Sequence, residues 1–426
     1  MLRFRLKIKV IIVLSVFISF YYSVLVEAKT FKVASYNVEN FFDLCKDGTE
    51  YIEYIPNTKY GWNKDILEIK GANIAKVIKS LEADVIALQE IESKKALIFL
   101  QDKLRRIGVD YSYIGIADSK ATAVKCAVMS KFPIINKEEI RVGHRSERNI
   151  LKVTLDIDGN SFILFINHWK SKQGPESRRI TYAKKIRKEI DQLKKTVDFI
   201  VIGDFNSNYN EYKTFKYSSR LNNTGGITGI NQIIRTVKDS VMVDEKILTG
   251  QFSKEYLYNL WLEFTKSRRW SYKFYGYKNS PDSIIVSSGL YDDKGISYVD
   301  NSFDKFDPDY LFKGQDIYRW QMDESDGGKH LGKGYSDHLP VFAYFSTKPL
   351  HFKNNAAFCN HIVTSHLIDL NSAAPKELQT IKGIGPVLSA RIIAGRPYKT
   401  VDDLLKVKGI GVKTLEKICP YFVVKH

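Results

Sequence analysis

Short apolar segments that end in polar side chains recur along this chain, and they constrain its fold more than any other feature. Phe199-Ile200-Val201-Ile202 leads into Gly203-Asp204-Phe205-Asn206, and Val85-Ile86-Ala87-Leu88 leads into Gln89-Glu90. Unbroken apolar runs of this length are typical of strands that are buried on both faces. Because the ends of neighbouring strands open on one crevice, we expect their polar side chains to lie close together.

Helical segments alternate with these strands. Apolar residues recur at helical spacing over residues 64–81, and a basic helix is expected over residues 178–195. Further strands are expected at residues 31–36, 125–129, 151–157, 162–166, 283–286 and 341–345. This alternation predicts an α/β domain. In the Tyr-, Asn- and Lys-rich stretch 208–279 we expect a helix with elaborated loops, and Trp261 and Leu262 in the core.

The length and the charge of the chain indicate two domains and an acidic partner. A chain of 426 residues is long enough for two domains. Its formal net charge is +17, to which the first 28 residues contribute a surplus of only three positive charges. Such a surplus favours polyanionic partners, although a general enrichment in lysine can produce part of it.

The first 28 residues have the pattern of a secretory signal peptide. Basic residues between Arg3 and Lys9 precede an apolar stretch over residues 10–26, and Val26-Glu27-Ala28 is a small-residue cleavage site. Cleavage after Ala28 would leave a periplasmic or extracellular protein with no stable membrane insertion. The alternative is an uncleaved anchor, since the apolar stretch is near the lower length limit for crossing a bilayer.

Four cysteines would then lie in an oxidising compartment, where disulfides persist: Cys45, Cys126, Cys359 and Cys419. Their spacing matches no zinc motif. Cys359 and Cys419 flank the C-terminal segment and are candidates to staple it, and Cys126 lies in an apolar strand as a candidate buried thiol. The connectivity stays open.

The C-terminal segment contains a near repeat. Residues 378–385, Leu-Gln-Thr-Ile-Lys-Gly-Ile-Gly, return as residues 404–411, Leu-Leu-Lys-Val-Lys-Gly-Ile-Gly. In each copy an apolar helix is expected to run into a tight glycine turn, whose N–H groups can hold a phosphate at the start of the next helix. The residues expected to do so are Lys382, Gly383, Gly385, Lys408, Gly409 and Gly411. Simple packing turns are the alternative, but they do not explain the duplicated Lys-Gly-Ile-Gly.

Acidic and amide side chains at expected strand ends form a candidate catalytic centre. Glu90, with Asn37 and Asp337, offers oxygen ligands for a hard cation such as Mg²⁺; Mn²⁺ fits as well, and an additional Ca²⁺ stays open. Asp204 and Asn206 are candidates to orient an attacking water molecule or to bind phosphate. Each residue alone is an ordinary turn residue, but together they predict metal-assisted hydrolysis of a phosphate ester.

Two histidines add acid–base chemistry. His338 directly precedes the last expected strand and is the candidate base, with Asp282 as the carboxylate that would align it. His168 follows the strand expected at 162–166 and is a candidate to protonate the leaving oxygen or to hydrogen-bond a phosphate oxygen in the transition state. The alternative for His168 is a buried histidine that packs against Trp169.

The order of these motifs resembles the endonuclease/exonuclease/phosphatase superfamily, which includes deoxyribonuclease I and the abasic-site endonucleases, and within it most closely the secreted bacterial nucleases. The motifs are Ser35-Tyr36-Asn37-Val38-Glu39-Asn40, Leu88-Gln89-Glu90, Asn167-His168-Trp169-Lys170-Ser171-Lys172, Gly203-Asp204-Phe205-Asn206-Ser207 and Ser336-Asp337-His338. The resemblance implies an α/β fold over residues 29–347, a four-layer sandwich of two packed mixed sheets flanked by helices.

The resemblance also implies roles for individual residues. It places Asn37, Glu90 and Asp337 at a metal site, and it makes Asp204, Asn206, His338, Asp282 and His168 catalytic. Arg148 falls where the deoxyribonuclease I branch often has a phosphate-contacting arginine, and Lys170 is expected to bind DNA too. Two departures concern supporting residues: related enzymes usually have His where this chain has Ser283, and Asp118 is only a weak candidate for the carboxylate beside His168.

Residues 365–426 resemble the helix-hairpin-helix domain of competence DNA-receptor proteins, a small all-α module that holds duplex DNA by its backbone. Residues 348–364 are expected to be a linker.

Together the two resemblances imply a secreted, Mg²⁺-dependent DNase with little sequence specificity, which we expect to be an endonuclease without a protein partner. The alternatives are a DNA-uptake receptor with an inactive nuclease-like body, or a phosphatase or lipid phosphodiesterase on the same fold. The basic aromatic stretch 268–273 either lines the DNA groove or is a charged loop over buried rings.

Overall fold

A computed structural model of the protein describes most of the chain. The described residues are 29–143, 147–194, 196–215, 218–250, 255–348, 368–381, 384–411, 414–415 and 418–424. The expected signal peptide (1–28) and all but the first residue of the expected linker lie outside these ranges. Within them, no helix is both long enough and apolar enough to cross a membrane.

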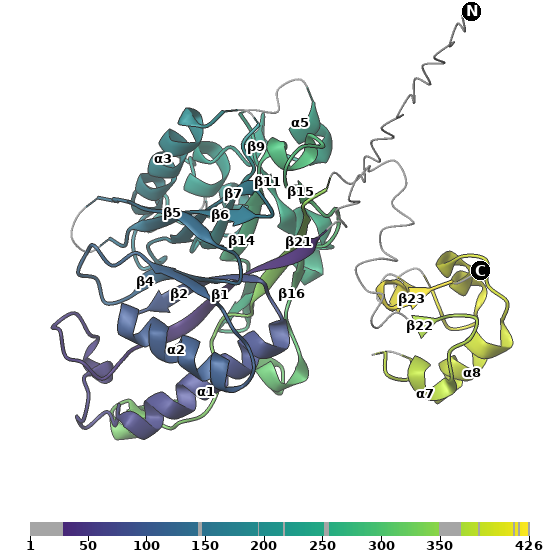
Figure 1. The fold of residues 1–426 in the computed structure, drawn as a ribbon, viewed down its shortest axis with the longest axis horizontal. Helices are drawn as coiled ribbons and strands as arrows, with labels where there is room; N and C mark the ends of the chain where they lie inside the picture. The colour runs from purple at the N-terminus through teal and green to yellow at the C-terminus, as the bar shows by residue number, and fades with distance from the viewer. Residues whose placement is uncertain are drawn as a thin grey trace, which may run out of the picture.

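Two mixed β-sheets form the body of the protein (Figure 1). Sheet 1 has seven strands, in the order β15 (Ser297–Tyr298), β21 (Val341–Ser346), β1 (Thr30–Phe41), β2 (Val85–Ile91), β4 (Lys125–Ser130) and β3 (Tyr113–Ile116), with β16 (Asp304–Lys305) also paired to β21. Sheet 2 has six, in the order β11 (Tyr258–Asn259), β14 (Asp282–Val286), β8 (Phe199–Asp204), β7 (Asn160–His168), β6 (Ile150–Ile157) and β5 (Ile134–Ile140).

The two sheets share one pairing pattern. In sheet 1 the central strands β1 and β2 are parallel, and β21 and β4 flank them in antiparallel orientation. In sheet 2 the central strands β7 and β8 are parallel, and β6 and β14 flank them in the same way. The carboxyl ends of the central strands and the amino ends of β21 and β14 therefore lie at one edge of each sheet. This edge carries the polar residues that follow the apolar runs.

Three apolar cores separate four layers. The first lies between the sheets and joins Val33 and Val85 of sheet 1 to Leu164 and Ile200 of sheet 2. The second packs α1 (Lys64–Leu81) and α2 (Lys94–Arg106) on the outer face of sheet 1, and the third packs α3 (Glu176–Gln192) on the outer face of sheet 2. Successive strand residues point to opposite faces, so continuous apolar runs serve both cores. The predicted four-layer α/β sandwich is confirmed.

Local signals set the ends of the helices. Asn63 caps α1 by accepting a hydrogen bond from the N–H of Ile66, and Ser93 caps α2 in the same way. Helix α3 begins at Glu176 after Pro175 and ends at Gln192, so the basic helix starts two residues earlier and stops three residues earlier than predicted. The early start fits proline's fixed backbone angle just before a helix.

The stretch 208–279 contains short elements rather than one long helix. They are α4 (Glu211–Thr214), a π-turn (Gly229–Ile233), β9 (Val237–Lys238), β10 (Val241–Met242), α5 (Glu245–Thr249), 3₁₀ turns at Leu260–Glu263 and Lys266–Arg268, β12 (Tyr272–Phe274) and β13 (Tyr277–Asn279). Trp261 is fully buried and Leu262 packs partly buried beside it, as predicted.

The other elements of the body are short. Four two-residue strands lie before β21: β17 (Phe312–Lys313), β18 (Asp316–Ile317), β19 (Met322–Asp323) and β20 (Lys329–His330). The remaining 3₁₀ turns of the body are Ile52–Tyr54, Ser288–Tyr291, Asp309–Leu311 and Glu324–Asp326.

The C-terminal segment folds around a core of its own. Its elements are α7 (Pro375–Leu378), α8 (Pro386–Ala394), 3₁₀ turns at Val401–Lys406 and Cys419–Tyr421, and the parallel pair β22 (Ile368–Asp369) and β23 (Phe422–Val423). The isoleucines of the two Lys-Gly-Ile-Gly turns, Ile384 and Ile410, are both buried in that core. The repeat therefore builds one module, and the short strand pair, which the sequence did not indicate, joins its two ends.

The cysteines differ in their surroundings. Cys126 is buried in β4, and burial raises the pKa of its thiol to about 12. Cys45 is exposed, with its sulfur 3.2 Å from Nζ of Lys95. Cys359 lies outside the described residues, so whether it pairs with Cys419 to staple the module stays open.

Candidate active site where the two sheets meet

The polar edges of the two sheets touch through Asn37. Its Nδ2 donates to Oε1 of Glu90 at 3.2 Å and to Oδ2 of Asp204 at 3.1 Å. Asn37 and Glu90 belong to β1 and β2 of sheet 1, and Asp204 ends β8 of sheet 2. The structure thus gathers, from distant parts of the chain, side chains that the sequence placed at separate strand ends.

The register of sheet 2 sets three functional side chains in a row. Asp204 pairs across the sheet with Asp282 on one side and with His168 on the other. Directly paired residues point to the same face of a sheet, so these three side chains share one face. Gly203 makes the alignment possible: its φ is +131°, and a Cβ atom there would lie 2.1 Å from the carbonyl oxygen of Asn167.

Several polar residues of the site hold a left-handed backbone. The φ angles are +52° at Glu39, +62° at Asn40, +68° at Glu90 and +48° at Asn206. Residues other than glycine adopt such angles at an energetic cost, and they concentrate at functional sites. In return, Glu90 Oε2 accepts a bond from the N–H of Asn40 at 2.8 Å, which fixes the carboxylate.

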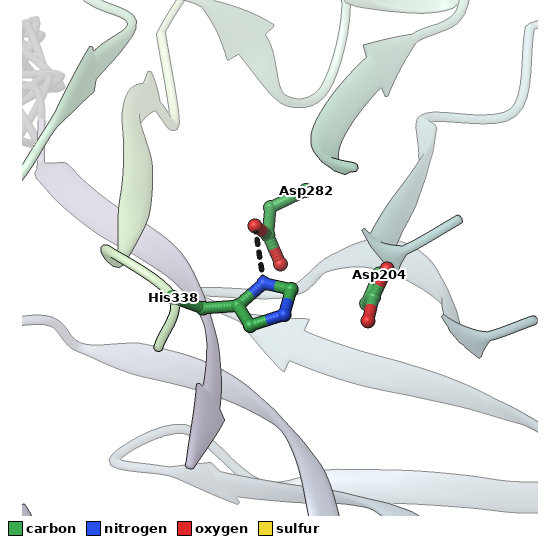
Figure 2. Close-up of side chains that lie close together, drawn as sticks. All are labelled: Asp204, Asp282 and His338. Atoms are coloured by element: carbon green, nitrogen blue, oxygen red, sulfur yellow. Dashed lines mark hydrogen bonds and ion pairs between the residues drawn. The ribbon is translucent and has the colours of Figure 1, made fainter. Parts of the chain in front are cut away.

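His338 and Asp282 form a buried pair (Figure 2). Nδ1 of His338 lies 2.8 Å from Oδ2 of Asp282, which also accepts a bond from the Ser271 hydroxyl at 2.6 Å. The imidazole faces the ring of Tyr272, with centroids 4.7 Å apart. Ligand atoms of His338, Asp282 and Asp204 lie within 4.8 Å of one another. Since Nδ1 is occupied by Asp282, Nε2 is the atom left for proton transfer.

The surrounding carboxylates set the charge on this pair. Burial opposes charge on His338, but Asp282 and Asp337 outweigh it and raise the pKa of the imidazole well above 6.5. Burial also raises the pKa of Asp204 to about 7, although nearby His338 opposes the rise. In the absence of a metal ion, the charged imidazole of His338 thus lies among carboxyl groups. A cation bound nearby would lower the pKa values of these groups.

His168 lies on the other side of the cluster. It is 3% exposed, and its Nε2 lies 3.5 Å from Oε1 of Glu90 and 3.6 Å from Oδ2 of Asp204. Burial and repulsion by Arg148 lower the pKa of His168 well below 6.5, so its imidazole is neutral. Among the described residues Nδ1 of His168 has no hydrogen-bond partner, so Asp118 does not bond to it there; the Asp118 carboxylate lies 3.9 Å from Nζ of Lys137.

The charges of Glu90, Asp204 and Asp337 suit a hard divalent cation, although the close group of ligand atoms at the site is formed by Asp204, Asp282 and His338. Burial raises the pKa of Asp337 as well as that of Asp204, and the charge of Glu90 adds to both shifts. Several carboxylates that burial disfavours need a counter-charge to ionise together, and their oxygens are ligands that Mg²⁺ accepts. Asn37 fits less directly: its Oδ1 accepts a bond from the N–H of Glu39 at 3.0 Å, so its amide would have to turn to offer that oxygen.

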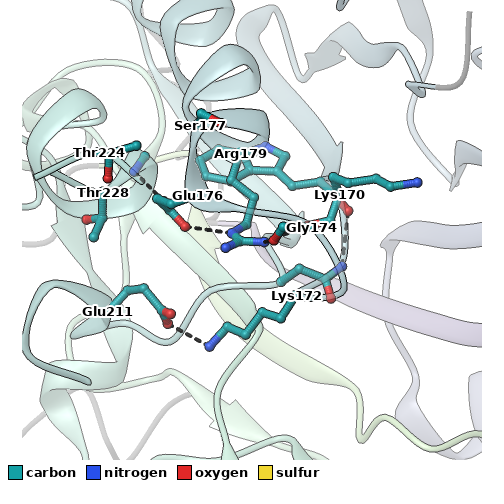
Figure 3. Close-up of polar contacts among 12 residues, drawn as sticks. Lys170, Lys172, Gly174, Glu176, Ser177, Arg179, Glu211, Thr224 and Thr228 are labelled. Atoms are coloured by element: carbon teal, nitrogen blue, oxygen red, sulfur yellow. Dashed lines mark hydrogen bonds and ion pairs between the residues drawn. The ribbon is translucent and has the colours of Figure 1, made fainter. Parts of the chain in front are cut away.

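A buried ion pair fixes the loop that follows His168 (Figure 3). Nε of Arg179 donates to Glu176 at 2.7 Å, and Nη1 donates to the carbonyl oxygens of Ser171 at 3.1 Å and Gly174 at 3.2 Å. Glu176 also accepts a bond from the N–H of Gly229 at 2.8 Å. Helix α3 therefore holds the loop backbone from inside the protein.

The fixed loop presents positive charge beside the site. Lys172 pairs with buried Glu211 at 2.8 Å, whereas no ion pair of Lys170 occurs in the described part of the chain. Burial lowers the pKa of Lys170, and repulsion from Arg178 and Arg148 adds to that effect. Arg148 donates to the carbonyl oxygen of Trp169 at 3.2 Å. Arg148 and Lys170, the two residues of the body predicted to bind DNA, thus lie near each other.

The hairpins of the C-terminal module are described in part. Lys382 and Gly383 lie outside the described residues, and Gly385 is the N-cap of α8. In the second copy, Gly409 has a φ of +104°, and the carbonyl oxygen of Lys408 accepts a bond from Arg391 at 2.9 Å. Gly411 starts the following turn, since its carbonyl oxygen accepts bonds from the N–H groups of Thr414 and Leu415.

Some residues at the site gave no signal in the sequence. Arg319, which lies 3.7 Å from Asp337, is in none of the quoted motifs, and Ser271, which supports Asp282, is in the stretch 268–273 but was given no role at the active site. Arg268 and Arg269 both bond to other parts of the protein. Arg268 pairs with Asp304 and Arg269 donates to backbone carbonyls. For these two arginines, the alternative of a charged loop over buried rings describes the structure better.

Comparisons with known proteins agree with this organisation. Residues 32–226 and 236–347 match the profile of the endonuclease/exonuclease/phosphatase family, and residues 363–423 match the helix-hairpin-helix motif. A deoxyribonuclease of Thioalkalivibrio sp. (strain K90mix) is 37% identical over 83 residues, 20% of this chain and 22% of that protein. ComE operon protein 1 of Bacillus subtilis (strain 168) is 43% identical over 63 residues, 14% of this chain and 31% of that protein.

The chain therefore aligns with less than a third of the length of each of these two relatives. Among solved structures, a humanized TDP2 of D. rerio has a TM-score of 0.45 at 13% identity, with 74% of this chain and 98% of that chain covered.

Proposed function

The chain belongs to the endonuclease/exonuclease/phosphatase family, and on that premise we propose that it is a secreted, metal-dependent deoxyribonuclease that its C-terminal module tethers to duplex DNA. The observation that carries the proposal is the buried His338–Asp282 pair, which faces Asp204 within one cluster of carboxylates. An acid–base pair beside candidate cation ligands is suited to the hydrolysis of a phosphodiester.

The residues divide the chemistry between them. Asp204 and Asn206 hold the attacking water, since the Asp204 carboxylate is fixed by the N–H of Asn206 at 2.8 Å. His338 exchanges a proton through Nε2, and Asp282 holds its ring in position. Neutral His168 hydrogen-bonds a phosphate oxygen. A divalent cation at Glu90 and Asp337 supplies Lewis-acid polarisation of the phosphoryl group when bound.

DNA is the proposed substrate because two relatives and the charge of the chain favour it. One stretch of 83 residues is similar to a protein named deoxyribonuclease, and one of 63 residues is similar to part of ComE operon protein 1. The formal charge of +17 favours a polyanion. Tethering to duplex DNA raises the local concentration of phosphodiester bonds at the active site. The leader pattern at 1–28 supports export to the periplasm or the medium.

A plasmid assay tests the proposal. The chain without residues 1–28 is incubated with supercoiled plasmid and Mg²⁺, beside an EDTA control and the His338→Ala variant. Conversion to nicked and linear DNA that both controls abolish supports a metal-dependent endonuclease. Plasmid that stays intact but is retarded on a gel favours a DNA receptor with an inactive body. Plasmid that is neither cut nor bound directs the search to other phosphate esters.

A further inference from the structure

Arg319 is a cation at the active site to which none of the motifs assigns a role. Its Nη2 lies 3.7 Å from Oδ2 of Asp337, a candidate cation ligand that directly precedes His338. Its side chain is nevertheless 55% exposed. A guanidinium that touches the cluster and is also open to solvent can reach a bound ligand.

The protein holds this guanidinium in place. Nε of Arg319 donates to Oε1 of Glu39 at 2.9 Å, and the other oxygen of Glu39 accepts from the N–H of Trp320 at 2.9 Å. The backbone is closely packed as well, since a Cβ atom on Gly334 would lie 1.9 Å from the carbonyl oxygen of Arg319. Preorganisation of this kind reduces the entropy that binding would cost.

One edge of the guanidinium is left for a ligand. Nε and Nη2 both bond Glu39, whereas the described part of the chain gives Nη1 no hydrogen bond. The planar fork of arginine matches phosphate oxygens. Arg148 and Lys170 lie on the β7 side of the cluster, whereas Arg319 contacts Asp337 on the β21 side. Positive charge therefore flanks the catalytic cluster on both sides.

We propose that Arg319 binds the backbone phosphate next to the scissile one, on the β21 side of the active site. This inference rests on the proposed function. The scissile phosphate has to lie against His338 and the cation ligands, and Arg319 is held on Asp337 and Glu39. A strand that crosses the cluster brings its next phosphate to the free edge of the guanidinium. Arg319 thus favours polynucleotides over esters with one phosphate.

The alternative is that Arg319 only holds Asp337 in position. Substrate size separates the two roles. Bis(p-nitrophenyl) phosphate has one phosphodiester and no neighbouring phosphate, whereas a short DNA duplex has both. If Arg319 binds the neighbouring phosphate, Arg319→Ala weakens only the reaction with DNA. If it only holds Asp337, both reactions weaken together.

The experiment measures kcat and KM of the full chain without residues 1–28 on both substrates. For Arg319→Ala we expect a KM for the duplex about tenfold higher with little change in kcat, and unchanged hydrolysis of the small ester. Arg319→Lys should recover part of the loss. Arg105→Ala is the matched control, because Arg105 is 54% exposed and pairs with Asp102 away from the site.

The salt dependence provides a second readout. In the His338→Ala background with EDTA, Arg319→Ala should lower the slope of log Kd against log salt by about one. An unchanged KM and slope, or an equal loss on both substrates, would overturn the inference. Wild-type protein that cuts neither substrate would instead count against the proposed function.

Discussion

Nδ1 of His338 lies 2.8 Å from Oδ2 of Asp282, and the two residues are 56 positions apart in the chain. The bond joins the start of β14 in sheet 2 to the turn before β21 in sheet 1. Ser336 supports it from sheet 1, since its hydroxyl donates to the carbonyl oxygen of Asn37 and accepts from the N–H of His338. The geometry of the pair therefore depends on the packing of the two sheets.

The first prediction concerns this pair. Asp282→Asn preserves the size of the side chain but removes the charge that orients His338. We expect kcat on plasmid DNA to fall by on the order of 100-fold, as for loss of a general acid–base group. Circular dichroism should match wild type. Ser271→Ala, which removes one hydrogen bond to the same carboxylate, should cause a smaller loss in the same direction. A fully active Asp282→Asn enzyme would contradict the assigned role.

A bound cation should stabilise the fold. Mg²⁺ at Glu90 and Asp337 would neutralise carboxylates that burial disfavours, and at a concentration of 100 Kd it adds about 2.7 kcal/mol to the free energy of unfolding. Thermal unfolding with and without Mg²⁺ measures this effect, and Glu90→Gln should remove it. The control is Glu245→Gln, which removes a carboxylate from the separate Glu245–Glu263–Asp300 group. If Glu245→Gln instead removes the stabilisation by Mg²⁺, the cation binds at the Glu245–Glu263–Asp300 group and not at Glu90.

Gly203 should tolerate no side chain. A Cβ atom would lie 2.1 Å from the carbonyl oxygen of Asn167, and its φ of +131° is unfavourable for other residues. We expect Gly203→Ala to lower the free energy of unfolding by about 2 kcal/mol or more. Gly276→Ala is the control, because Gly276 also has a positive φ, +81°, but nothing lies within 4 Å of its Cβ position. If urea unfolding gives the same loss of free energy of unfolding for both variants, the close contact between β7 and β8 at Gly203 does not contribute to stability.

The strand ends were predictable because the signal is local. An apolar run such as 199–202 has to be buried on both faces, and Asp204 follows it directly. Neighbouring strands then bring their ends to one edge, so the meeting of Asn37 and Glu90 followed from the fold class, whereas the approach of Asp204 depends on how the second sheet packs on the first. The register that aligns Asp282 with Asp204 was not needed for that prediction.

The supporting residues were not predictable in the same way. Arg319 and Glu39 are 280 positions apart, and the path of the loops between β16 and β21 decides that they meet. Arg269 reads as a surface charge in sequence but turns inward to the carbonyl oxygens of Phe264 and Leu262. Every residue has a backbone carbonyl that can accept such a bond, so the sequence does not indicate which residue will be the partner of the arginine.

Buried His330 should make stability depend on pH. It accepts a bond from Trp320, and burial lowers its pKa to about 4. Unfolding frees the imidazole to titrate near 6.5, so between pH 6.5 and 4 the unfolded chain binds the extra proton. The stability that neutral His330 contributes is therefore complete above pH 6.5 and is lost as the pH falls toward 4.

The measurement compares wild type with His330→Gln, so that the other titrating groups cancel. The difference between their free energies of unfolding should shrink by about 3 kcal/mol from pH 6.5 to pH 4. Urea unfolding at several pH values gives this difference directly. A difference that is constant over the range would mean that the histidine titrates alike in the folded and unfolded chains.

The C-terminal module should control binding to DNA without taking part in the chemistry. Gly409 has a φ of +104°, and a Cβ atom there would lie 3.2 Å from Nη1 of Arg391, so Gly409→Ala should distort the second hairpin. Lys408→Ala should remove about one phosphate contact and lower the salt slope of duplex binding by about one. Both variants should bind duplex DNA more weakly and hydrolyse bis(p-nitrophenyl) phosphate at the wild-type rate. Exposed Lys376, which lies on α7 and not in either Lys-Gly-Ile-Gly turn, is the control, and Lys376→Ala should change neither property. Loss of ester hydrolysis in the hairpin variants would mean that the module supports the active site instead of tethering it.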